Sequence, residues 1–93
     1  MIVSFACAET ERIFRGDRSR RFLPDIQNTA RRKLEYVHRA RTLSDLRMPP
    51  GNRLEAMKGN RKGQHSIRVN DQWRLCFEWQ DGNAARVEMV DYH

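Results

Sequence analysis

The sequence lacks any long apolar run. No stretch approaches the roughly 20 apolar residues that a membrane-spanning helix needs, which excludes a helical membrane protein. The opening residues MIVSFACAETER place no basic segment ahead of an apolar one, so they do not resemble a secretory signal peptide. We therefore expect a cytoplasmic protein with no membrane partner.

Cysteine and histidine are few and far apart. Cys7 and Cys76 form no CxxC pair, and in a cytoplasmic protein we expect two small buried side chains rather than a disulfide. His38, His65 and His93 show no spacing typical of metal ligands. We accordingly expect neither a metal ion nor a cofactor.

The motifs of several enzyme classes are also missing. There is no Gly-x-Ser-x-Gly, no His-Glu-x-x-His and no dinucleotide fingerprint, and GNRKG at 59–63 lacks the spacing and the Ser/Thr of a P-loop. An enzyme built from this sequence must rely on Lys, Arg, Tyr, His and carboxylates. RNA can be cut in this way, because its 2′-hydroxyl is a built-in nucleophile and cationic side chains can stabilise the charged transition state.

Positive charge is what the sequence does have, with a net charge of +6. Between Arg12 and Arg41 there are ten Lys/Arg residues and three acidic ones. Between Thr42 and Asn70 there are six Lys/Arg residues and two acidic ones. From Asp71 onward the balance reverses, with two arginines against five acids. A basic body with an acidic final segment suggests a polyanionic partner, although a merely solvated basic surface remains an alternative.

With 93 residues the chain has room for one small domain, to which we assign residues 1–93. Apolar and β-branched runs predict four strands, and spacings of three to four residues predict two helices. The expected strands are 1–5, 65–69, 73–79 and 85–92, and the helices are 8–16 and a second one from Pro24 with an apolar stripe at Ile26, Ala30, Leu34 and Val37. The order β-α-α-β-β-β indicates an α+β fold whose mainly antiparallel sheet packs on the two helices.

In the strand expected at 73–79, a large apolar side chain occupies every second position. Its apolar face should pack on the helices, and its other face, which carries Arg74, should be at least partly exposed. A half-exposed guanidinium held on a sheet offers a planar fork for phosphate oxygens. Pairing of Arg74 with Glu78 or Glu88 is an equally open interpretation, and Arg68 carries the same ambiguity.

Two further segments can contribute to a site. The stretch EAMKGNRKG gathers Lys58, Arg61 and Lys62 in a glycine-bounded loop that can receive phosphates or can simply be solvated. The final residues VDYH place Asp91 and His93 on one side of an extended chain, where the carboxylate can orient the imidazole. On the residues alone, a frayed polar end explains VDYH as well.

The quoted stretches together resemble a known family. PPGNRLE, then NRLEAMKGNRKGQHSIRVNDQWRLCFEW, and finally VEMVDYH are similar to the HigB branch of the RelE-type toxins of bacterial toxin–antitoxin pairs. This resemblance implies a microbial-ribonuclease-like fold and an endoribonuclease that cleaves mRNA in the ribosomal A site without a metal. It also implies a HigA-like antitoxin with a helix-turn-helix domain, through which the complex contacts operator DNA.

The resemblance assigns roles to individual residues. Lys58 and Arg74 would stabilise charge on the phosphate, His93 would transfer the proton, Asp91 would orient His93, and Tyr92 would stack on or hydrogen-bond to the RNA. Further RNA contacts are predicted for Arg53, Arg61, Lys62 and Arg68.

One position departs from the pattern of the family. Some relatives have a histidine shortly before the lysine, where this chain has Glu55, which is either an alternative base or a neutralising partner of Arg53. A second function remains open: a non-catalytic basic module that binds the ribosome or an antitoxin.

Overall fold

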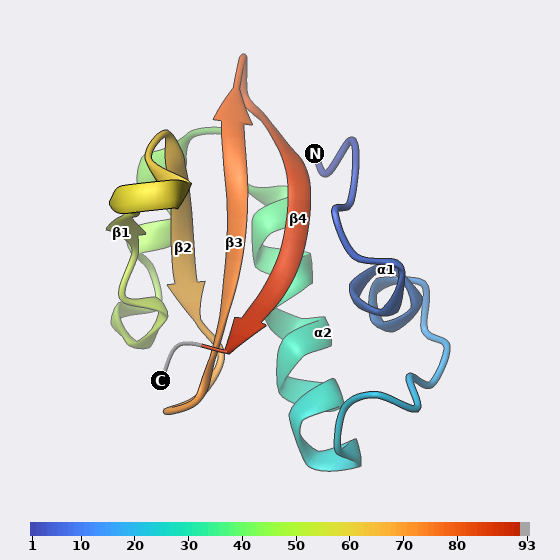
Figure 1. Ribbon diagram of the computed structural model, residues 1–93. Coiled ribbons are helices and arrows are strands. Elements are labelled where there is room, and N and C mark those ends of the chain that lie inside the picture. The colour runs from blue at the N-terminus through green and yellow to red at the C-terminus, as the bar shows by residue number, and fades with distance from the viewer. Residues whose placement is uncertain (92–93) are drawn as a thin grey trace.

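A four-stranded antiparallel sheet forms the centre of the protein (Figure 1). The computed structural model describes residues 1–91. The strands are β1 (Glu55–Ala56), β2 (Gln64–Arg68), β3 (Trp73–Gln80) and β4 (Asn83–Asp91), and they lie side by side in chain order. Asp81 and Gly82 join β3 to β4 with φ values of 51° and 79°, as the two-residue turn of a tight hairpin requires. Asp-Gly is a dipeptide that favours such a turn, and it lies between the strands expected at 73–79 and 85–92.

Two helices cover one face of the sheet. α2 (Pro24–Arg39) lies behind the strands in Figure 1, and α1 (Ala8–Phe14) lies beside β4. The predicted stripe of α2 is buried in the core, where it meets Leu75 and Phe77 of β3. Gly16 ends the first helix with a φ of +89°, a conformation that L side chains rarely adopt. The predicted α+β fold is confirmed, and Leu75 and Phe77 of β3 pack in the core as expected. The other face of β3 is not exposed as expected, because Arg74 and Cys76 are buried too.

The first predicted strand differs from the expectation. Ile2 pairs with Ala84 and Phe5 pairs with Val87 as isolated parallel bridges, so the segment runs along β4 without forming a regular strand. The backbone N–H of Ile2 instead donates to Nδ1 of His38 at 3.2 Å. The segment contacts both the edge of the sheet and α2, so its backbone pairing with β4 is interrupted.

The connection between α2 and β2 contains more elements than the single short helical turn that the sequence predicts within residues 42–52. It forms the short 3₁₀ helices η1 (Leu43–Arg47), η2 (Pro50–Asn52) and η3 (Gly59–Arg61), and the two-residue strand β1 lies between η2 and η3. β1 extends the sheet because Glu55 pairs with Ser66 and Ala56 pairs with His65. The connection thereby brings Glu55 and Lys58 next to the face of the sheet that is opposite α2.

Asp45 caps η1. Its carboxylate accepts hydrogen bonds from the backbone N–H groups of Thr42 at 3.0 Å and Arg41 at 2.9 Å. These bonds, led by that from Thr42, lower the pKa of Asp45 below its usual 3.8.

We predict that Asp45 contributes to acid sensitivity. A carboxyl whose pKa is lower in the folded state stabilises the fold above the unfolded value and loses this contribution as pH falls through the folded value. Urea titrations between pH 6 and pH 2 should therefore show a smaller loss of stability in Asp45→Asn than in the wild type below about pH 4. An identical pH dependence in both proteins would contradict this assignment.

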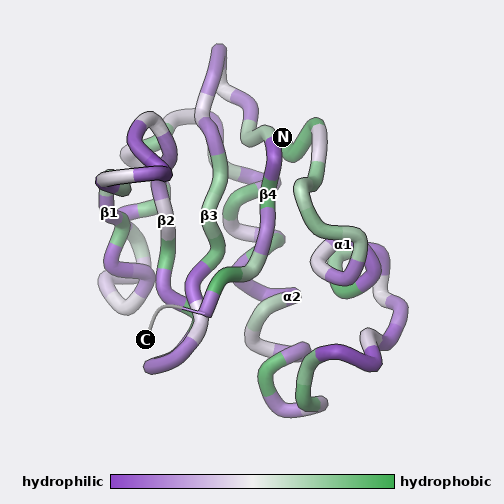
Figure 2. Tube along the Cα trace, viewed as in Figure 1, coloured by the Kyte–Doolittle hydropathy of each residue, from purple (hydrophilic) through white to green (hydrophobic). Residues whose placement is uncertain are grey.

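Figure 2 shows the hydropathy along the chain. The tube is hydrophobic within β3 and hydrophilic along most of the connection between α1 and α2. Within residues 1–91, no helix is long and apolar enough to cross a membrane.

Candidate functional site

Arg74 is the best-anchored charged residue of the sheet. It lies on the face opposite α2, and its Nε donates to Oγ of Ser66 at 2.8 Å while its Nη2 donates to the carbonyl oxygen of Arg53 at 2.6 Å. Only 6% of the residue is exposed, so the expected half-exposed position is wrong. Within residues 1–91 its carboxylate neighbour is Glu55, with 3.9 Å between Nη2 and Oε2, and not Glu78 or Glu88. The bonds to Ser66 and Arg53 fix the plane of the guanidinium.

The loop segment Asn52 and Arg53, which anchors Arg74, is held in place by a contact with α2. Arg53 has a φ of 46°, and this left-handed conformation directs its carbonyl oxygen toward Arg74. The preceding residue, Asn52, is fully buried and accepts a hydrogen bond from Nζ of Lys33 at 2.6 Å. Burial lowers the pKa of Lys33, and the charges of Arg32 and Arg68 add to this effect. A chain of contacts thus runs from α2 to the guanidinium of Arg74.

A shallow hollow opens next to Arg74. It is lined by Glu55, Lys58 and Arg61 together with Ala56, Met57 and Asn60. Three residues predicted for the site therefore come together here, and Glu55 connects the hollow to Arg74. The hollow thus holds an exposed lysine and a carboxylate that lies close to the fixed guanidinium of Arg74. The two cations can bind a phosphate, and the carboxylate can accept a proton beside it.

Arg61 also has a structural role. Its Nη1 lies 2.8 Å from Oε1 of Glu88 on β4 and 3.1 Å from Oε1 of Gln64. Glu55, Ser66, Cys76 and Glu88 form one row across the four strands, so the ion pair of Arg61 with Glu88 spans the sheet above Cys76.

Cys76 is a fully buried residue of this row and lies beneath the ion pair of Arg61 with Glu88. Burial raises the pKa of its thiol, which keeps the sulfur protonated and unreactive. Cys76 and Cys7 are free thiols. Cys76 is buried as expected, whereas Cys7 is only partly buried.

The remaining predicted residues are placed differently. Arg68 pairs with Arg74 in the strand register, but its Nη2 contacts Oδ1 of Asp71 at 2.5 Å. Lys62 is exposed at the end of η3. Asp91 pairs with Trp73, which places it on the helix side of the sheet, away from Arg74, and it accepts a hydrogen bond from Gln72 at 3.1 Å. Tyr92 and His93 lie outside the described residues.

Sequence reasoning missed Ser66, Asn52 and Lys33, which position Arg74. Ser66 carried a usable signal, because it shares a strand face with Arg68, the register partner of Arg74. Asn52 and Lys33 are 19 residues apart and follow no shared pattern. Within residues 1–91, no three His, Cys, Asp or Glu side chains lie close enough to hold a metal ion.

Comparison with known proteins decides the family. The model of the HigB-like toxin family, described as the RelE-like toxin HigB of type II toxin–antitoxin systems, matches residues 3–93. The chain belongs to this family. The match includes Arg74, the hollow beside it and the final residues, so the HigB-like toxin assignment extends over the whole candidate site.

Individual relatives agree with the HigB-like assignment. Toxin HigB-1 of Vibrio cholerae is 47% identical over 88 residues, which cover 94% of this chain and 93% of that protein. Endoribonuclease HigB of Proteus vulgaris is 39% identical over 41 residues, which cover 44% of this chain and 45% of the relative. An uncharacterized protein of Haemophilus influenzae is 32% identical over 72 residues, or 77% of this chain and 71% of its own length.

Proposed function

We propose that this HigB-like toxin is a metal-independent endoribonuclease that cleaves mRNA in the ribosomal A site and so inhibits translation. The family match and the relative named as an endoribonuclease support the activity. The observation that carries the proposal is the anchored guanidinium of Arg74 beside a hollow lined by Lys58 and Glu55. Such an arrangement suits a phosphodiester, because fixed cationic donors stabilise the charge that develops in the transition state.

The reaction we propose needs no group outside the protein and the RNA. The 2′-oxygen attacks the adjacent phosphorus and loses its proton to a base. The bond from phosphorus to the 5′-oxygen breaks and that oxygen takes up a proton, which leaves a 2′,3′-cyclic phosphate and a 5′-hydroxyl. Arg74 and Lys58 contact the phosphate oxygens, and the contacts made by Arg53, Arg61, Lys62 and Arg68 extend along the RNA backbone.

Two residues are candidates for the base. In our proposal His93 moves the proton, with Asp91 orienting it and Tyr92 contacting the RNA. Glu55 is the alternative, because its carboxylate lies 3.9 Å from Nη2 of Arg74 and would be close to a phosphate held there. Asp91 bonds to Gln72 on the other face of the sheet, so an orienting role requires it to exchange that partner.

The partners follow from membership of a type II system. We propose a HigA-like antitoxin with a helix-turn-helix domain as the protein partner in the cytoplasm. The complex would contact operator DNA through the antitoxin. The free toxin would contact the ribosome and mRNA, and the net charge of +6 favours association with both.

The role of His93 is tested by His93→Gln. We expect a loss of mRNA cleavage of about 10²–10⁴-fold, which is the usual contribution of a general acid or base, and growth should resume after induction. Primer extension on a defined message, with ribosomes present, measures the cleavage. Glu55→Gln is the matched control: if it abolishes cleavage while His93→Gln does not, Glu55 is the base.

The same experiment separates the enzyme from a binding module. A non-catalytic module would arrest growth without cutting messages, and it would still do so after both His93→Gln and Arg74→Ala. Growth arrest that survives both changes, with intact mRNA and a folded protein bound to ribosomes, would exclude the catalytic function.

A further inference from the structure

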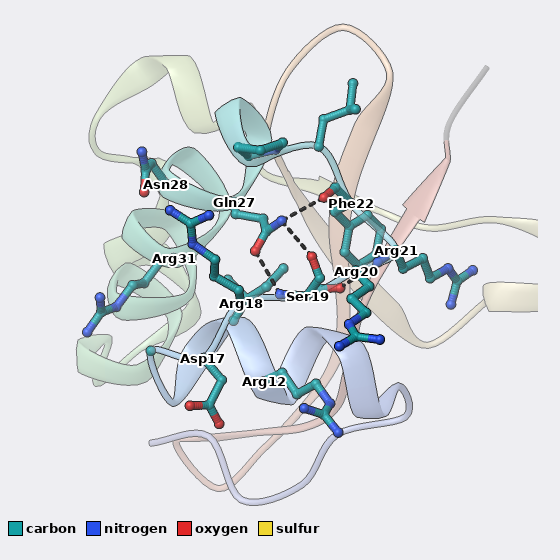
Figure 3. Close-up of a pocket in the computed structure, with 14 residues that line it drawn as sticks. Arg12, Asp17, Arg18, Ser19, Arg20, Arg21, Phe22, Gln27, Asn28 and Arg31 are labelled. Atoms are coloured by element: carbon teal, nitrogen blue, oxygen red, sulfur yellow. Dashed lines mark hydrogen bonds between the residues drawn. The ribbon is translucent and has the colours of Figure 1, made fainter.

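A second cationic surface lies between α1 and α2, apart from the hollow that is lined by Glu55 and Lys58. We call it the arginine loop and define it by Arg12, Arg18, Arg20, Arg21 and Arg31. These side chains surround a hollow of about 900 Å³ (Figure 3). α1 packs beside β4, whereas the hollow near Arg74 lies by β1 at the opposite edge of the sheet (Figure 1). The two hollows share no lining residue, but the arginine loop reaches the end of β4: Arg21 and Phe22 line another hollow with Gln72 and Trp73, the hydrogen-bond and register partners of Asp91.

The backbone beneath the arginine loop is held rigidly by Gln27. Its side-chain amide accepts from the N–H of Ser19 at 2.9 Å and donates to the carbonyl oxygens of Ser19 at 2.9 Å and Phe22 at 2.6 Å. Oγ of Ser19 donates to Glu9 at 2.7 Å and accepts from the N–H of Arg21 at 3.1 Å. Because the backbone is already ordered, a ligand bound by the flanking arginines would not have to order it.

Most of the charge on the arginine loop is not neutralised by the protein. Arg18, Arg20 and Arg31 form no ion pair within residues 1–91. Arg12 shares Glu9 with Ser19, at 3.3 Å from the carboxylate. Arg21 lies over the ring of Phe22 at 5.5 Å. Asp17 is the one acid that lines the hollow, against five guanidinium groups.

We propose that the arginine loop binds the phosphate backbone of double-helical RNA. Guanidinium groups bind phosphate oxygens in a bidentate manner, and five of them around one hollow can contact phosphates on both sides of a groove. The proposal rests on the proposed function only in taking RNA as the target. It adds a docking surface that is independent of cleavage.

Other ligands fit the arginine loop less well. Single-stranded RNA is held largely by stacking on exposed aromatic rings, but Phe22, the aromatic residue of the hollow, is only 5% exposed. An acidic peptide would need apolar anchors in buried pockets, and the lining here is mainly polar, with Leu23 exposed at its margin. Backbone contacts to a duplex need neither feature.

Binding to a labelled RNA hairpin, followed by fluorescence anisotropy, tests the proposal. The hairpin carries 2′-O-methyl groups, which remove the nucleophile of the proposed cleavage and so separate binding from catalysis. We compare Arg18→Gln/Arg20→Gln with Arg39→Gln/Arg41→Gln, which changes the net charge equally. Arg18 and Arg20 precede α2, whereas Arg39 is its last residue and Arg41 follows it, so the two pairs flank a 16-residue helix about 24 Å long.

The Arg18/Arg20 variant should bind the hairpin at least about tenfold more weakly. The slope of the logarithm of its binding constant against the logarithm of the salt concentration should become shallower by about one for each lost phosphate contact. The control should stay within about threefold of the wild type, because long-range charge effects are screened. Arg18→Lys/Arg20→Lys should bind with intermediate affinity, because lysine keeps the charge and loses the fork. Thermal unfolding verifies that each variant is folded.

Three results would overturn the proposal. Equal weakening by both arginine pairs would show that net charge alone governs binding. A larger effect of Arg18/Arg20 on a 2′-O-methyl single strand than on the hairpin would contradict duplex recognition. Unchanged hairpin binding together with loss of antitoxin binding would assign the arginine loop to a protein partner. None of these depends on cleavage, so a failure here is distinguishable from a failure of the proposed endoribonuclease activity.

Discussion

Replacement of Arg74 by lysine is expected to slow mRNA cleavage by about 10²–10³-fold, the usual effect of removing one fixed donor to a transition-state oxyanion. Lysine keeps the positive charge. It cannot, however, bond at the same time to Ser66 and the carbonyl oxygen of Arg53 while presenting a planar group to a phosphate. The ammonium would therefore be held less firmly, and the loss should appear mainly in kcat.

The control for Arg74→Lys is Arg86→Lys. Arg86 lies on β4, is exposed, and contacts Glu78 at 3.5 Å, so the same chemical change there should alter cleavage by less than about threefold. Single-turnover cleavage of a programmed ribosomal complex measures the rate. Urea titration measures stability, since unsatisfied partners of Arg74 cost about 1–3 kcal/mol. Wild-type cleavage by folded Arg74→Lys would show that the fork of Arg74 has no role in the reaction.

The Ser66→Ala variant tests whether the position of the Arg74 guanidinium matters for cleavage in addition to its charge. It leaves Arg74 in place and removes the oxygen that accepts from Nε. We expect a smaller loss of cleavage than with Arg74→Lys, because the carbonyl oxygen of Arg53 still holds Nη2.

Periodic features of the sequence predicted the fold well. The stripe of α2 and the alternation of β3 each repeat over many residues, so packing in the core cannot easily override them. The hairpin between β3 and β4 was predictable because Asp-Gly suits a turn that requires positive φ. The segment near Ile2 was less predictable, because its pairing depends on β4 and on His38, which are distant in the chain.

The candidate site was predictable by residue type and less so by environment. Arg74 and Lys58 were found from the strand pattern and the basic loop, Glu55 from the resemblance, and the structure brings Glu55 close to both of the others. The burial of Arg74 was not predictable, because it depends on contacts with Ser66 and Arg53 across separate elements. Arg61 and Arg68 were chosen as cations, but their nearest partners are carboxylates of Glu88 and Asp71.

Asn52 is expected to be a key residue for stability. It accepts from Lys33, which is only 7% exposed, and its own amide donates to the carbonyl oxygens of Leu46 at 3.2 Å and Met48 at 3.3 Å. Asn52→Ala would leave a nearly buried ammonium and two carbonyl groups without these partners. We expect a loss of about 2–4 kcal/mol in the free energy of unfolding, measured by urea titration.

A double-mutant cycle identifies the cause of this loss. Lys33→Met keeps the apolar stem and removes the ammonium, so Asn52→Ala should cost about 0.5–3 kcal/mol less in the Lys33→Met background than in the wild type. Additive losses would show that Asn52 acts through its bonds to Leu46 and Met48 and not through Lys33.

The pH dependence of stability gives an independent readout of the same contact. Burial lowers the pKa of Lys33 below its usual 10.5, so between the two values the unfolded chain binds more protons than the folded one. The contribution of Lys33 to stability must then rise with pH across that alkaline range. Asn52→Ala removes an acceptor from the ammonium and should steepen this rise, whereas Lys33→Met should abolish it. Because Arg53 follows Asn52 and holds Arg74, a steeper profile accompanied by slower cleavage would connect the buried ammonium on α2 to the position of the guanidinium.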